Sequence, residues 1–311
     1  MTRDCAPPTR AVFVVGVARS GTTLLVRLLD AHPQLFVLPC ESHAVDWCGA
    51  ESPVAAFIAR RGMDGPFFRD GKRRVPFEQM LGRMLPGPAS LPDALRALVA
   101  SYAHYEPPPE SARAWVEKTP KHLRNVPLLL HAFGPDTRFV CMVRDPRAVM
   151  ASQFERWDRG ALRHVRTFAA RWAEADRLTA RFEADIPQFR VVRYEDLVAK
   201  PEATMRGVAA HLGIDWDEIL LAPTARGAEW RGNTSANAPQ SGISAESVSR
   251  YVDQLGPDAL REIERIVAPR IVARGYDLAD RSALRPSLRR AIAEAHAWAR
   301  VRRDARSWPR E

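Results

Sequence analysis

Cysteine is scarce in this chain, with four among 311 residues, and the spacing of these four limits the metal sites that they could form. Cys5, Cys40, Cys48 and Cys141 form no C-x-x-C pair and are accompanied by no histidine pair, so the sequence argues against a zinc site. In a reducing compartment we also expect no disulfide. Cys141 lies within an apolar run and is predicted to be an inert core thiol.

Long apolar runs are missing as well. No stretch approaches the ~20 apolar residues that a membrane-spanning helix needs. The segment Met1–Arg10 contains Pro7, Pro8 and charged residues but no apolar core, so it does not have the pattern of a signal peptide. We therefore expect no transmembrane segment and a cytoplasmic location.

Acidic residues are too few to balance the basic ones, and the formal net charge is +9. Much of the excess lies in residues 281–311, where nine arginines stand against three acidic residues. Leu284, Leu288, Ile292 and Ala295 recur there at helical spacing, which predicts a basic amphipathic helix. A solvated helix lying on the core is favoured, and peripheral contact with a membrane surface stays open. We predict one domain over residues 1–280 and a basic tail over residues 281–311.

Short apolar segments alternate with amphipathic ones along the chain. The predicted strands are Val12–Gly16, Leu35–Leu38, Arg138–Val143 and Phe189–Tyr194, and Ala114–Pro120 is predicted as a short strand that runs into a loop. The predicted helices include Leu91–Tyr102, Val126–Phe133, His164–Ala184 and Pro201–Leu212. Such alternation predicts an α/β fold of three layers, a phosphate-loop type with a mostly parallel central sheet flanked by helices. Charged motifs follow the strands, and ligands gather at that edge of a parallel sheet.

The first predicted strand runs into a loop bounded by Gly16 and Gly21, and a helix follows. A glycine-bounded loop before a helix N-terminus is an anion site, because unpaired N–H groups and the helix dipole favour negative charge. The usual phosphate loop has lysine after its second glycine, but here Thr22 stands there and Arg19 is the only cation. The loop therefore holds an anion that is not handled as magnesium ATP.

These residues carry a family resemblance. The run from Gly16 to Leu25, followed by Leu29-Asp30-Ala31-His32-Pro33, resembles the 5′-phosphosulfate loop of sulfotransferases. These enzymes use 3′-phosphoadenosine 5′-phosphosulfate (PAPS) and release adenosine 3′,5′-bisphosphate (PAP). The pattern is most similar to the protein-tyrosine and carbohydrate branch, and it extends from about Val12 to Leu278. The resemblance implies that residues 1–280 form a sulfotransferase domain.

The resemblance also implies which residues hold the donor. Those assigned to the 5′-phosphosulfate are Arg19, Ser20, Gly21, Thr22 and Thr23. Those assigned to the 3′-phosphate or the rest of the nucleotide are Arg144, Ser152, Arg156, Tyr194 and Ser235. The family's lysine near the last of these falls on Ser241, and Arg231 or Arg250 are candidates to replace it. A structural ion pair with Asp145 or Glu195 is the alternative for Arg144, and a structural role is favoured for Arg147.

For catalysis the resemblance implies Glu41 as the base that removes the acceptor's proton, with His43 as a nearby rival. Arg19 and Lys118 would stabilise the charge that develops on the leaving group. No metal is expected, because transfer from PAPS has no triphosphate to neutralise.

The sequence leaves open which hydroxyl accepts the sulfuryl group: that of a carbohydrate, a lipid, a small molecule or a tyrosine. We expect no nucleic-acid partner. Two alternatives to a sulfotransferase remain. One is a small-molecule kinase that uses ATP on the same loop, and the other is a non-catalytic module that binds a nucleotide or polyanion.

Overall fold

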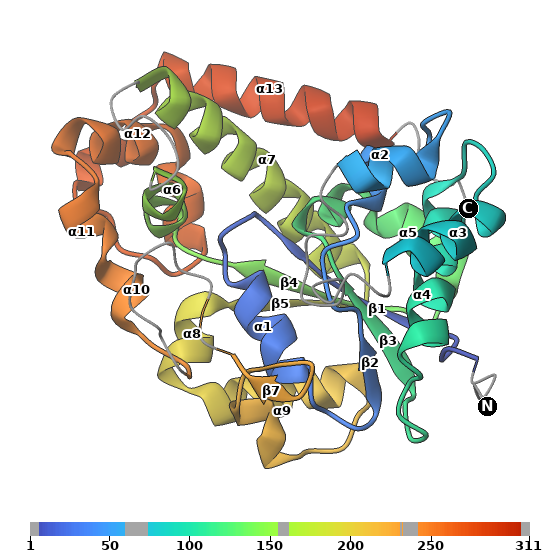
Figure 1. Cartoon of the computed structure of the whole chain (residues 1–311). Helices are drawn as coiled ribbons and strands as arrows, with labels where there is room; N and C mark the ends of the chain where they lie inside the picture. The colour runs from blue at the N-terminus through green and yellow to red at the C-terminus, as the bar shows by residue number, and fades with distance from the viewer. Residues whose placement is uncertain (1–5, 60–73, 155–161, 231, 233–241, 306–311) are drawn as a thin grey trace.

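A five-stranded parallel sheet forms the centre of the protein (Figure 1). The computed structural model describes residues 6–59, 74–154, 162–230, 232 and 242–305. The strand order is β2-β3-β1-β4-β5, and every neighbouring pair is parallel. The strands are β1 (Arg10–Gly16), β2 (Leu35–Val37), β3 (Ala114–Lys118), β4 (Arg138–Val143) and β5 (Phe189–Arg193). The predicted sheet is thus confirmed.

The helices before the sheet's last strand are α1 (Thr22–Leu29), α2 (Pro53–Ala59), α3 (Arg74–Met84), α4 (Leu91–Tyr105), α5 (Val126–Phe133), α6 (Pro146–Phe154) and α7 (Leu162–Asp185). Those after it are α8 (Tyr194–Ala199), α9 (Pro201–Leu212), α10 (Glu246–Ser249), α11 (Tyr251–Gln254), α12 (Pro257–Ala273) and α13 (Leu288–Ala305). The 3₁₀ turns are η1 (Ala44–Asp46), η3 (Pro120–Asn125), η4 (Glu218–Leu221) and η5 (Arg281–Leu284), and β6 (Thr224–Ala225) pairs with β7 (Ala228–Glu229) in a small hairpin.

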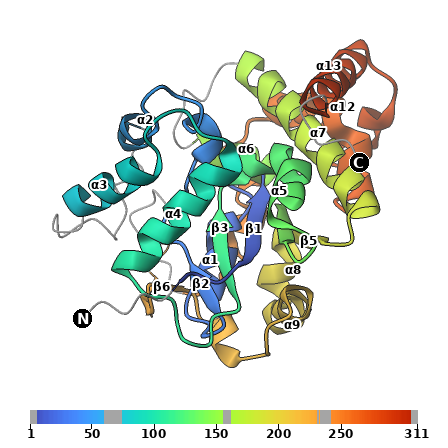
Figure 2. The ribbon, with the colours of Figure 1, turned by 90° about the vertical axis from the view of Figure 1, so that its right-hand side faces the viewer.

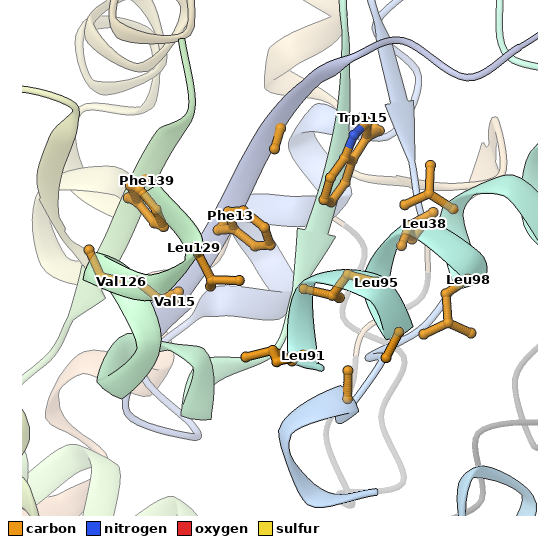
Figure 3. Packing of buried hydrophobic residues seen from close by; sticks show 14 of the residues in the cluster. Phe13, Val15, Leu38, Leu91, Leu95, Leu98, Trp115, Val126, Leu129 and Phe139 are labelled. Carbon is orange, nitrogen blue, oxygen red and sulfur yellow. The ribbon is translucent and has the colours of Figure 1, made fainter. Parts of the chain in front are cut away.

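Both faces of the sheet are buried, which explains why β1 is apolar throughout. Phe13 and Val15 point to the face covered by α4 and α5 (Figure 3). The Phe13 ring lies 5.3 Å from Trp115 and 5.5 Å from Phe139, measured between centroids. Val12 points to the opposite face, in the cluster that α1 and α9 complete. The three predicted layers are therefore present.

A third cluster of buried residues forms where α6, α7, α12 and α13 pack together. α13 runs alongside α7 in both views of the ribbon (Figure 1 and Figure 2). None of the described helices is long and apolar enough to cross a bilayer.

The predicted face of the tail helix is wrong. Leu288 is 77% exposed and Ile292 47% exposed, and Leu284 lies in η5 before the helix begins. α13 instead contacts the body through buried Ala293 and through Glu294, which pairs with Arg177 and Arg270. Ion pairs with α7 and α12 orient the helix, and the spacing of apolar residues could not show them.

Two further differences are local. Tyr194 begins α8 instead of ending β5, so its ring leaves the strand edge at the start of a helix. The predicted helix Leu91–Tyr102 is α4, and it extends three residues further, to Tyr105. The Cys141 thiol is fully buried as predicted, and burial raises its pKa to about 12.

Candidate active site

The loop after β1 has the backbone of an anion-binding turn. Gly16 has φ of 141°, and a Cβ there would lie 2.5 Å from the Met142 carbonyl oxygen. Arg19 (φ 74°) and Gly21 (φ 96°) are also left-handed, and Ser20 N donates to Val17 O over 3.1 Å. Gly21 caps α1 without a side-chain bond, so the first N–H groups of this helix are left for a ligand.

A cavity of about 510 Å³ opens over this loop. Its lining contains most of the predicted site residues, namely Arg19, Gly21, Thr22, Thr23, Glu41, Arg144, Ser152 and Tyr194. The Ser20 side chain is buried beneath the loop and does not line the cavity. Arg156, Ser235, Ser241 and Arg231 lie outside the described residues. The structure thus brings the two halves of the predicted site, from the starts of α1 and α6, into one space.

Arg19 and Arg144 join these halves directly. Arg19 Nε donates to Ser152 Oγ over 2.9 Å, and Arg144 Nη1 donates to the Arg19 carbonyl over 3.1 Å. Arg144 Nη2 donates to Ser247 O over 2.5 Å, and its guanidinium lies 4.4 Å from the centre of the Tyr194 ring. Arg144 Nε is buried and has no partner among the described residues.

The alternative for Arg144, a structural ion pair with Asp145 or Glu195, is not observed among the described residues. Asp145 binds Arg147 instead, and the two oxygens of Glu195 accept from Asp145 N and from Tyr276 Oη. Burial lowers the pKa of Arg144, while the charges around it act in the opposite direction. A largely buried guanidinium whose own side chain binds only carbonyl groups favours an anionic ligand.

Arg147 is a structural residue, as the sequence indicated. Its guanidinium is buried in ion pairs with Asp145 and Glu264 at 2.6 Å each, and it also donates to Asp277 O over 2.7 Å. These bonds join the start of α6 to α12 and to the segment that follows it. The bonds of Arg147 therefore fix the position of the turn that carries Arg144.

The proposed base and the second proposed cation touch. Lys118, at the end of β3, forms an ion pair with Glu41 and donates to Thr23 Oγ1 over 3.2 Å. His43 Nε2 lies 3.1 Å from the other oxygen of Glu41. The carboxylate therefore sits between Lys118 and the rival base His43. Lys118 is largely buried, which contradicts the exposed position that is usual for lysine.

A buried acidic network behind these residues was not predicted. Glu117 is 0% exposed and accepts hydrogen bonds from Ser42 Oγ (2.7 Å), Ser42 N (3.1 Å) and Thr119 Oγ1 (2.6 Å). Its second oxygen lies 2.9 Å from His122 Nδ1. Burial would raise the pKa of Glu117, but the charge of His122 and these hydrogen bonds outweigh it and lower the pKa to about 2.

This network holds the loop that carries the two candidate bases. Ser42 lies between Glu41 and His43, and His43 N donates to Thr119 Oγ1 over 3.1 Å. The sequence did contain a signal, because a glutamate within an apolar strand and a histidine five residues later are unusual in a core.

Another wall of the cavity comes from the described residues between 230 and 251, for which the sequence predicted no definite role. Trp230, Gly232, Ser247, Arg250 and Tyr251 line it. Ser247 Oγ lies 2.6 Å from Tyr194 Oη, so α10 is tied to the start of α8. Arg250, a candidate to replace the family's lysine, does face the cavity. Within the described residues there is no group of three or more histidine, cysteine or acidic side chains suited to a metal.

Comparison with known proteins agrees with this geometry. The sequence pattern of the sulfotransferase family matches residues 11–218, two thirds of the chain. The chain therefore belongs to the sulfotransferase family. This confirms the resemblance that the glycine loop carried.

Named relatives point to one branch. Protein-tyrosine sulfotransferase 2 of Gallus gallus is 26% identical over 279 residues, covering 86% of this chain and 69% of the relative. Protein-tyrosine sulfotransferase 1 of Danio rerio is 27% identical over 282 residues, covering 86% and 72%.

Solved structures share the fold. The sulfotransferase domain from the curacin biosynthetic pathway has a TM-score of 0.57 at 19% identity, covering 88% of this chain and 99% of that domain. The sulfotransferase domain of the Synechococcus PCC 7002 olefin synthase has a TM-score of 0.54 at 20% identity, covering 89% and 98%. The phosphate-loop type of fold is thus confirmed.

Proposed function

We propose that this sulfotransferase takes a sulfuryl group from PAPS and transfers it in line to an acceptor hydroxyl, with Glu41 as the base. The observation that supports it most is the shared cavity, in which the glycine loop, the Arg144–Ser152 pair and Glu41 all meet. A donor with anionic groups at both ends needs two cationic cradles in one space. The relatives named as protein-tyrosine sulfotransferases support a hydroxyl acceptor.

In this proposal the loop residues from Arg19 to Thr23 bind the 5′-phosphosulfate through the first N–H groups of α1 and the two threonine hydroxyls. Arg144 and Ser152 bind the 3′-phosphate, to which Arg144 Nε could donate without losing its present bonds. Tyr194 packs under the Arg144 guanidinium and keeps it in place. Arg156 and Ser235 complete the proposed set.

The chemical step forms one bond and breaks one. The acceptor oxygen attacks sulfur, the bond from sulfur to the bridging phosphate oxygen breaks, and PAP leaves with the electron pair. The acceptor's proton passes to a carboxylate oxygen of Glu41. Lys118 and Arg19 stabilise the charge that grows on the bridging oxygen. Lys118 pairs with Glu41 in the present structure, so its ammonium group must also contact the donor when PAPS binds.

The test uses PAP first and PAPS second. PAP should raise the melting temperature, because any ligand that binds only the native state stabilises it. Radiolabelled sulfate should then pass from PAPS to a hydroxyl acceptor without added magnesium and in the presence of EDTA. A magnesium-dependent transfer from ATP would instead indicate the kinase alternative, and binding without any transfer would indicate a non-catalytic module. The cytoplasmic location and the membrane contact of the tail stay predictions.

A further inference from the structure

A second cavity of about 780 Å³ adjoins the donor cavity. The two share Ala18 of the glycine loop and Pro120 and Lys121 after β3. Asp46 also lines the second cavity and lies 4.0 Å from His43, which in turn contacts Glu41. Glu41 and His43 line the donor cavity and not the groove, so a molecule in the groove would have to extend into the donor cavity to reach the proposed base. The groove's size is ordinary for a small-molecule site.

The floor of the groove is apolar. Met150 of α6 and Phe168, Trp172 and Leu178 of α7 line it, together with Val17 of the loop. Met150, Phe168, Trp172 and Leu178 are 1–7% exposed, so the floor is the closed surface of the packed core and offers a ligand little apolar area. Apolar walls carrying a few polar groups are typical of sites for small organic ligands.

The rim of the groove is basic. Lys121, Arg124, Arg171 and Arg300 line it, and Asp46 is the one acidic residue among its described lining residues. Asp46 pairs with Lys121 over 2.7 Å, and buried Glu174 pairs with both Arg124 and Arg300. Lys121 and Asp46 belong to the end shared with the donor cavity, so among the described residues three arginines stand against Glu174 in the rest of the groove. The excess positive charge attracts an anion at the end of the groove away from Glu41.

We propose that this groove binds the acceptor, and that the acceptor is an organic anion with a hydroxyl at one end and a carboxylate or phosphate at the other. The inference rests on the proposed function, because it assigns the acceptor of the same reaction. The hydroxyl end extends into the donor cavity toward Glu41, and the acidic group lies in the groove among Arg124, Arg171 and Arg300.

The experiment measures binding as well as turnover. Two matched pairs of probes differ only in their acidic group: 6-hydroxy-2-naphthoate with 2-naphthol, and 4-hydroxyphenylpropionate with 4-propylphenol. Each is titrated by equilibrium dialysis, with and without PAP, into the wild-type chain and into Arg171→Gln, Arg300→Gln and the double variant. Arg261→Gln is the matched control, because Arg261 is an exposed arginine of α12 that pairs with Asp258 and lines neither cavity.

The wild type should bind the acid of each pair more tightly than its neutral partner. Each groove variant should weaken the acid by up to about fivefold, the upper end of the range for exposed charge pairs, and leave the neutral probe unchanged. Added salt should reduce the same preference. Equal binding of acid and neutral probes in both pairs, or a preference that persists in the double variant, overturns the proposal.

These measurements distinguish an error in the groove assignment from an error in the proposed function. If sulfate is transferred from PAPS but acid and neutral acceptors have equal KM values in every variant, the groove assignment falls alone. If the arginine-dependent preference is present while PAP neither binds nor raises the melting temperature, the groove's ligand class stands and the donor assignment falls.

Discussion

Arg19 donates a hydrogen bond from Nε to the hydroxyl of Ser152 over 2.9 Å, although 133 positions separate the two residues in the chain. One belongs to the loop proposed for the 5′-phosphosulfate and the other to the helix proposed for the 3′-phosphate. Their contact shows that the two cradles adjoin, as a single nucleotide requires.

Removing the Arg144 side chain should weaken PAP strongly. Arg144→Ala loses a charge-assisted hydrogen bond to phosphate, so the loss should be roughly 1.5–3 kcal/mol, or about tenfold to 150-fold in Kd. Isothermal titration with PAP measures it. Arg206→Gln is the control, since Arg206 pairs with Glu202, stacks on Trp216 and lies outside the cavity. An unchanged Kd for Arg144→Ala would remove this residue from the donor site.

Changing Glu41 should separate chemistry from binding. Glu41→Gln keeps the size of the side chain but cannot accept the proton, so turnover should fall by about 10²-fold or more. The Kd of PAP should stay within about twofold, well below a tenfold step of 1.4 kcal/mol. His43→Asn is the paired variant and should retain measurable activity. If Glu41→Gln is active and His43→Asn is not, the base is His43.

The glycine before α1 should tolerate no side chain. A Cβ at Gly21 would lie 2.4 Å from Cδ2 of Tyr194, at a φ of 96° that L-residues rarely adopt. Gly21→Ala should therefore cost about 1–3 kcal/mol of stability. Gly87→Ala is the control, because Gly87 has open space around its Cβ position and no positive φ. Chemical denaturation of both variants measures the difference, and equal stabilities would contradict the strained loop.

Acid should destabilise the protein through Glu117. Its pKa is lowered to about 2 in the folded state from 4.5, so its ionised form stabilises the fold fully above pH 4.5. That contribution disappears as the pH falls from 4.5 toward 2, and it amounts to at most about 3 kcal/mol. Urea unfolding at several pH values measures the loss. The Glu117→Gln variant should be less stable at neutral pH, and its free energy of unfolding should change less between pH 4.5 and 2. If this pH dependence is the same in the variant and the wild type, Glu117 is not its source.

The same residue should influence catalysis without touching the substrate. Glu117 accepts from Ser42, which lies between the two candidate bases, so it is a positioning residue. Glu117→Asp should partly preserve kcat and Glu117→Gln should lower it further, while the Kd of PAP stays constant for both. If kcat follows only the fraction of folded protein, the role of Glu117 is purely structural.

The sheet and the phosphate loop could be predicted because their signals are local. The apolar run of β1, the paired glycines and the leucines of α1 are contiguous, and each strand end carries its own charged motif. Arg144 and Ser152 could be placed together because Arg144 directly follows β4 and Ser152 lies in the helix that begins two residues later. The family resemblance then supplied the roles proposed for these residues.

The second cavity and the Glu117 network could not be predicted in the same way. The rim of the groove combines Lys121, Arg171 and Arg300, which come from three elements and share no sequence motif. The orientation of α13 depends on Glu294 meeting Arg177 and Arg270, and no periodicity within the tail encodes its partners. Contacts between distant elements depend on tertiary packing, which local patterns do not contain.

The pairing of Arg147 with Glu264 has a practical consequence for anyone shortening this chain. The family pattern ends at residue 218, so a version truncated there would look complete by sequence. It would nevertheless lose α12, the anchor behind the Arg144 turn, and the carbonyl of Ser247 in front of it. Such a fragment would keep its glycine loop and lose two of the contacts that fix the Arg144 turn.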